Sequence, residues 1–161
     1  NIDQSYKDLV IIVAGGATYG GSGGGSSGRL YFNNDLTSGN YYWNYFGGNG
    51  NGSSSGVYAG GLSTSNFEFG TLWAGNTNPY SMSIITIYDY KNTTKSKAFK
   101  TITGATLLAG GNGTNSGTTN VNGTYMPTTA INSIYFHHGS ATGSDGNFRA
   151  NSQINIFGVK G

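Results

Sequence analysis

Cysteine is absent from this chain of 161 residues, and proline occurs only twice. Without cysteine the chain has neither a disulfide framework nor a thiolate metal site, so its stability must come from burial or from association of copies. Charge is also scarce: Asp, Glu, Lys and Arg make up 9% of the residues, and the net charge of +2 is too small to indicate nucleic-acid binding. The longest apolar run, at residues 9–14, is too short to cross a bilayer, so we expect no membrane insertion.

A start methionine is missing as well. Residues 1–7 show neither the basic region nor the apolar stretch of a signal peptide. We therefore expect that the chain is processed, or that it lacks an upstream N-terminal strand or segment. Its length fits a single domain that spans residues 1–161.

Glycine and short apolar runs are what the sequence has in abundance. It contains 29 glycines and 14% aromatic residues. Glycine at this density disfavours helices, because each interior glycine costs about 1 kcal/mol relative to alanine. Strands that are bounded by Gly, Asn and Ser turns tolerate it. The composition therefore predicts many short strands with long loops rich in Gly, Asn and Ser.

Nine segments read as strands, at residues 7–14, 29–33, 40–46, 67–72, 81–90, 97–103, 118–121 (weakly), 130–137 and 153–159. We expect loops at 20–28, 47–56 and 139–151. Segment 7–14 is apolar on both of its faces, which is typical of a strand that is covered on both sides. Eight to nine strands predict an all-β fold, an antiparallel two-sheet sandwich that resembles a jelly roll.

Lysines form the one basic cluster in the sequence, at positions 91, 95, 97 and 100. Lysine on an edge strand prevents further strands from pairing with that edge. The cluster therefore predicts a solvated edge strand near residue 97, protected by its lysines.

Nothing in the sequence indicates catalysis. The six carboxylates are scattered, and Asp35 is best explained by turn chemistry in residues 34–37. His137 and His138 are adjacent, and adjacent strand residues point to opposite faces, so they rarely share one metal. An alternative is a metal held between subunits by three copies of one histidine. We expect no enzyme activity, no cofactor and no metal site.

The segment at residues 40–46 is unusually aromatic. Alternation places Tyr41 and Trp43 on one face of the strand and Tyr42 and Phe46 on the other, so one set should lie in the core. Exposed Tyr and Trp suit sugar rings or a protein partner. The residues proposed for contact with a ligand or partner are Tyr19, Tyr41, Trp43, Tyr58 and Trp73.

Several strand and turn patterns together resemble a group of small structural proteins and fibre domains of tailed bacteriophages. They are YKDLVI at 6–11, LYFNND at 30–35, GNYY at 39–42, ITIYDY at 85–90 and NFRANSQINIFGVK at 147–160. Members of that group usually close with a strand that ends in Leu-Tyr-Gly, where this chain has Phe157 and Gly158. Asn151 stands where the group usually has glycine.

The resemblance implies a virion component but not which part of the virion. We expect a non-enzymatic structural protein on the external surface of the particle, a capsid decoration or fibre protein. It would assemble as a homo-oligomer, with a trimer favoured, and contact other virion proteins such as the major capsid or fibre protein. The alternative is a receptor-binding fibre tip or lectin-like adhesin that recognises host surface glycan.

Overall fold

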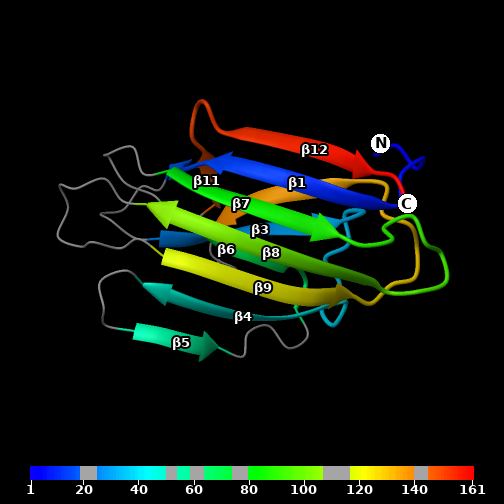
Figure 1. The fold of residues 1–161 in the computed structure, drawn as a ribbon, viewed down its shortest axis with the longest axis horizontal. Helices are drawn as coiled ribbons and strands as arrows, with labels where there is room; N and C mark the ends of the chain where they lie inside the picture. Colours follow the sequence, from blue (N-terminus) through cyan, green and yellow to red (C-terminus); the bar gives the residue numbers. More distant parts are fainter. Residues whose placement is uncertain (19–24, 50–53, 59–63, 74–79, 107–116, 140–144) are drawn as a thin grey trace.

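A computed structural model of the chain describes residues 1–18, 25–49, 54–58, 64–73, 80–106, 117–139 and 145–161. These residues form β-strands and turns and contain no helix (Figure 1). Nine strands have six or more residues, and three are shorter. The strands make two antiparallel sheets, so the all-β sandwich predicted from the sequence is confirmed.

The larger sheet has seven strands in the order β12-β1-β7-β8-β9-β4-β5. Their bounds are Gln153–Val159 (β12), Asp8–Gly15 (β1), Tyr80–Ile87 (β7), Lys97–Thr106 (β8), Gly117–Tyr125 (β9), Tyr41–Asn49 (β4) and Ser54–Tyr58 (β5). Every neighbouring pair is antiparallel. The edges of this sheet are therefore β12 and β5.

The smaller sheet has five strands in the order β2-β11-β10-β3-β6. Their bounds are Ala17–Thr18 (β2), Asp145–Phe148 (β11), Ile134–Gly139 (β10), Gly25–Phe32 (β3) and Phe67–Trp73 (β6). β6 packs against β7, β8 and β9 of the larger sheet. The strand order does not confirm the jelly-roll form, because β7, β8 and β9 follow one another as a meander in one sheet.

The core fills the space between the two sheets and is mostly aromatic at one end. The rings of Phe67 and Phe99 lie 3.9 Å apart between their centroids, and Phe32 meets Tyr125 edge-on at 5.1 Å. The other members of the buried cluster are Leu9, Ile11, Val13, Leu30, Tyr41, Trp43, Phe69, Leu72, Ile85, Ile87, Tyr90, Val121 and Ile131. Every second residue of β1 is buried, as alternation along a half-covered strand requires.

Three predicted loops contain strand residues. Segment 20–28 includes the first residues of β3, segment 47–56 includes the end of β4 and the start of β5, and segment 139–151 includes β11. These parts were expected to be loops because they have few β-branched or aromatic side chains. These residues form strands nonetheless, because their backbone pairs with a neighbouring strand, as Gly25 of β3 does with Trp73 of β6.

Asparagine occupies several positions where the backbone turns left-handed. Asn33 and Asn34 have φ of 53° and 57° in the turn after β3, and Asn151 has φ of 72° before β12. Glycine adopts this conformation without strain, and asparagine is among the residues that tolerate it. The backbone at Asn151 is therefore one that glycine would also adopt.

Candidate interaction surface

The most prominent surface feature is the side of the larger sheet that faces away from the smaller sheet, here called the outer face. Residues directly opposite each other in an antiparallel pair point to the same side. One row of the register therefore carries Ile12, Ile84 and Ile102 across β1, β7 and β8. It continues through Asn120 of β9 to Phe46 of β4.

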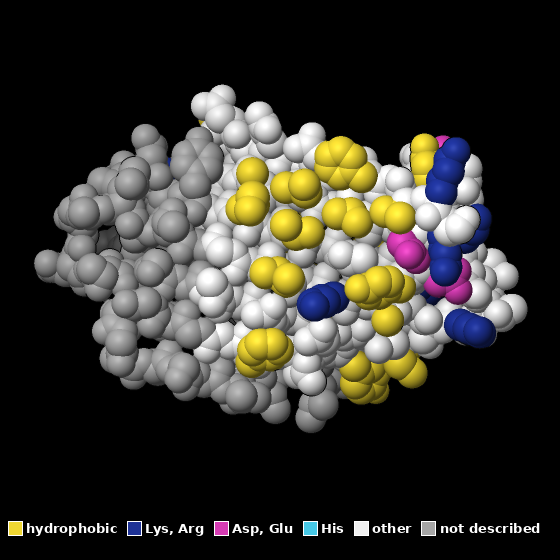
Figure 2. Space-filling view, viewed as in Figure 1, with side chains coloured by type: hydrophobic (Ala, Val, Ile, Leu, Met, Phe, Trp, Pro, Cys, Tyr) yellow, Lys and Arg dark blue, Asp and Glu magenta, His cyan; other side chains and the backbone are white. Residues whose placement is uncertain are grey.

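Large apolar side chains of this face are well exposed: Met82 by 53%, Phe157 by 50% and Ile102 by 48%. The others above 36% are Tyr42, Phe46, Ile84, Tyr88 and Val159. Figure 2 shows them spread across the sheet, with most of the visible charged side chains gathered at one end of the molecule. At about 80–100 Å² each, the eight together expose on the order of 700 Å², with polar side chains such as Asn120 between some of them.

Charge on the outer face is sparse. Among the described strand residues of this face, Lys100 and Asp8 are the charged ones. The Asp8 carboxylate already accepts the Asp89 backbone N–H at 2.7 Å. The face therefore offers apolar contact area and little that would attract a charged partner.

β1 was predicted to be covered on both faces, and this is wrong for the described chain. Leu9, Ile11 and Val13 are buried by the smaller sheet, but Val10 and Ile12 lie half-buried on the outer face. Nothing among the described residues packs over them as a third layer. β1 is thus apolar on both sides, but described residues cover only one of them.

The predicted lysine-protected edge is also wrong. β8 lies between β7 and β9, so it is an interior strand. Lys97 is fully buried, and its ammonium group donates to the carbonyls of Thr128 at 2.5 Å and Thr129 at 2.7 Å, with a longer contact to Pro127 at 3.4 Å. Desolvation lowers the pKa of Lys97, and the charge of Asp89 opposes this shift. Lys97 therefore holds the 127–129 connection in place.

Asp35 is a structural carboxylate, as predicted. It accepts the Thr37 backbone N–H at 2.9 Å, the Asn40 amide at 2.7 Å and the Tyr125 hydroxyl at 2.9 Å. Desolvation raises the pKa of Asp35, but hydrogen bonds from Thr37, Asn40 and Tyr125 outweigh it and leave the pKa below its usual value. The Tyr41 hydroxyl donates to the Asp35 carbonyl at 3.1 Å.

Two of the five residues proposed for ligand contact lie in the core. Tyr41 is fully buried, and Trp43 is 9% exposed, with its indole N–H donating to Thr64 at 3.1 Å. A buried ring cannot offer its face to a sugar, so the contact role of these two is corrected. Tyr19 and the side chains of Tyr58 and Trp73 lie outside what the structure describes.

The opposite faces of β4 follow the predicted alternation. Tyr41 and Trp43 point into the core, whereas Tyr42 and Phe46 are exposed on the outer face. The exposed aromatic set is thus the one that the contact hypothesis left out. His137 and His138 also alternate, since His138 is buried and His137 is half-buried.

Glu68 and Arg29 form one further polar pair, in the smaller sheet. Burial raises the pKa of Glu68, and the Arg29 charge opposes the shift; the two residues are register partners on β6 and β3. No group of three potential metal ligands occurs among the residues with described positions. The same part of the chain holds no helix long and apolar enough to span a membrane.

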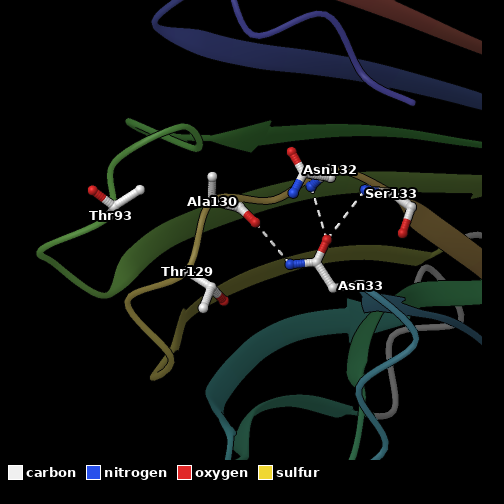
Figure 3. Close-up of a pocket in the computed structure, with 6 residues that line it drawn as sticks. All are labelled: Asn33, Thr93, Thr129, Ala130, Asn132 and Ser133. Atoms are coloured by element: carbon white, nitrogen blue, oxygen red, sulfur yellow. Dashed lines mark hydrogen bonds between the residues drawn. The ribbon is translucent and has the colours of Figure 1, made fainter.

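An open hollow lies where the 129–133 connection passes the turn after β3 (Figure 3). Asn33 is one of the residues that line it, and its amide donates to the Ala130 carbonyl at 2.8 Å. Its amide oxygen accepts the backbone N–H groups of Asn132 at 2.8 Å and Ser133 at 3.2 Å. Both ends of the side chain are engaged with backbone, so Asn33 braces two connections.

Comparison with known proteins adds no family: no family model matches the chain, and no curated protein or solved structure is significantly similar to it.

Proposed function

We propose that this chain is a non-enzymatic structural protein of a bacteriophage virion surface, a capsid decoration or fibre protein that assembles with copies of itself. The observation that carries the assembly part is the uncovered outer face. Eight large apolar side chains that are exposed on one face of a sheet favour an interaction site there. The resemblance of the strand and turn patterns to phage structural proteins supports the virion location.

The area of the outer face suits a protein partner. About 700 Å² on one copy approaches the ~800 Å² that each partner contributes to a standard interface. The face also lacks the charge that would select a strongly acidic or basic partner. Its aliphatic side chains on β1, β7 and β8 are separated from the aromatic ones of β4 by Asn and Thr of β9, a mixture of apolar and polar contacts that protein interfaces use.

Sedimentation equilibrium of the purified chain tests the assembly part. We expect reversible self-association that weakens in Ile102→Lys, which places a charge at the centre of the outer face. The matched control is Leu36→Lys, because Leu36 is an equally exposed apolar residue, 57% accessible, in the turn after β3. A wild-type chain that stays monomeric at high concentration contradicts the assembly proposal.

Immunogold electron microscopy of intact particles, with an antibody raised to this chain, tests the virion location. Regular labelling over the head supports decoration, and labelling of the tail supports a fibre protein. Particles that carry no label contradict the virion proposal.

A further inference from the structure

β12 is an unprotected edge strand. Within the described part of the chain it pairs with β1 alone, and all seven of its residues are exposed. An edge strand presents a row of backbone N–H and C=O groups without ladder partners, and proteins usually protect such edges with charge, proline or a bulge. β12 contains neither a charged residue nor proline, and its register with β1 runs without irregularity over seven pairs.

The side chains of β12 are apolar on both sides of the strand. Ile154 and Ile156 stand opposite Val13 and Ile11 of β1 and so point to the core side, while Phe157 stands opposite Val10 on the outer face. All three are between 40% and 50% exposed. β12 therefore extends the apolar outer face to the edge of the sheet and adds apolar surface below it.

We infer that β12 pairs antiparallel with β12 of a second copy, about a two-fold axis perpendicular to the sheet. Such an axis keeps the outer faces of both copies on the same side of the joined sheet. An odd-numbered residue must therefore stand opposite an odd-numbered residue, and an even-numbered residue opposite an even-numbered one. A centre at Ile156, the midpoint of the strand, aligns all seven residues. Ile156 then stands opposite Ile156 of the second copy, and Asn155 opposite its Phe157.

This register is self-complementary. No like charges oppose each other, and the central isoleucines form an apolar cross-strand pair, a favourable arrangement in sheets. Ile154 falls opposite Gly158 of the second copy, where the Tyr6 ring lies over the glycine. A two-fold contact uses the same patch on both copies, and the seven strands of each copy join into one sheet with a continuous outer face.

The size of the contact predicts weak pairing. Seven exposed residues at roughly 70 Å² each present about 500 Å² per copy, so the full contact reaches at most ~1,000 Å², the lower bound for a specific interface. The dimer should therefore depend on concentration. This inference rests on the proposed self-assembly, and it replaces the trimer favoured by the sequence with a two-fold pair.

Complementary charges at the two-fold axis test the pairing. Ile156→Lys and Ile156→Glu each place two like charges opposite one another, so each variant alone should dimerise at least tenfold more weakly than the wild type in sedimentation equilibrium. An equimolar mixture should recover the dimer, because lysine then faces glutamate. Leu36→Lys, at an exposed apolar residue in the turn after β3, is the matched control and should dimerise like the wild type.

The outcomes separate this inference from the proposed function. If Ile156→Lys associates like the wild type, or if the wild type is a trimer, edge pairing is overturned while self-assembly stands. If the wild type is monomeric throughout, both are overturned. Hydrogen exchange on the wild type needs no variant: amide protection in residues 153–159 should rise with protein concentration, and unchanged protection there overturns the pairing.

Discussion

Gly70 of β6 lies against Thr103 of β8 in the facing sheet, and replacing it with alanine tests that packing. Its φ is +133°, a conformation that residues with a side chain rarely adopt. A methyl group there would stand 2.7 Å from Cβ and 2.8 Å from Cγ2 of Thr103 on β8. Both distances are far below van der Waals contact, and the atoms belong to a stiff β-branched side chain.

The free energy of unfolding should fall by about 4 kcal/mol in Gly70→Ala. Backbone strain contributes about 1–3 kcal/mol, and overpacking contributes about 1–3 kcal/mol. Displacement of Thr103 also weakens its hydroxyl bonds to the Phe69 carbonyl at 2.6 Å and to Ser83 at 2.8 Å, at about 0.5–1.5 kcal/mol each. At about 2–4 °C per kcal/mol, Tm should drop by roughly 8–16 °C.

Urea unfolding followed by circular dichroism measures this change, with Gly104→Ala as the matched control. A methyl group on Gly104 would meet nothing within 4 Å, so that variant should stay within about 0.5 kcal/mol of the wild type or gain stability. In a Thr103→Ala background, Gly70→Ala should cost less, because the obstructing side chain is gone. A Gly70→Ala variant within 1 kcal/mol of the wild type would refute the reasoning.

Three further predictions concern buried polar groups. Lys97→Met should lower the free energy of unfolding by about 2–3 kcal/mol in urea titrations, because the carbonyls around the ammonium group lose their donor; a loss below 0.5 kcal/mol contradicts this. Desolvation raises the pKa of the Tyr125 hydroxyl. The stability that the buried neutral hydroxyl contributes is therefore fully present below the ordinary pKa of 10 and is lost as pH rises beyond it. Tyr125→Phe should flatten the alkaline fall in the free energy of unfolding, and an unchanged pH profile counts against this cause. The pKa of Asp35 is lowered. The stability that its carboxylate contributes is therefore present above the ordinary pKa of 3.8 and is lost as pH falls below it. In thermal melts across pH 2–6, Tm of Asp35→Asn should depend on pH less steeply than Tm of the wild type, and equal slopes contradict that cause.

Alternation and side-chain type were enough to find the long strands. The segment at residues 153–159 was predicted with the bounds that β12 has, and the strand predicted at residues 81–90 corresponds to β7, Tyr80–Ile87. The short strands β2, β5 and β11 were missed, because their residues pair through the backbone and carry little β-branched or aromatic signal. Strand order was equally hidden, since it depends on contacts between distant segments.

The interaction surface was predictable only in part. The sequence shows that residues 9–13 are apolar on both sides of a strand, but it does not show that one side stays uncovered within the described chain. Lys97 was expected on a solvated edge because lysine is usually exposed. Its burial depends on the carbonyls of the 127–129 connection, which accept hydrogen bonds from its ammonium group. That connection is distant from Lys97 in the sequence, so no local pattern predicts the contact.

The burial of Lys97 gives the protein an internal reporter of local opening. Of its six lysines, the other five are exposed and should react with an amine acylating reagent at ordinary rates. Lys97 can react only after the 127–129 connection lifts and releases the amine. Mass spectrometry of a timed acylation would thus follow the opening of that connection in the native protein, without a label or a mutation.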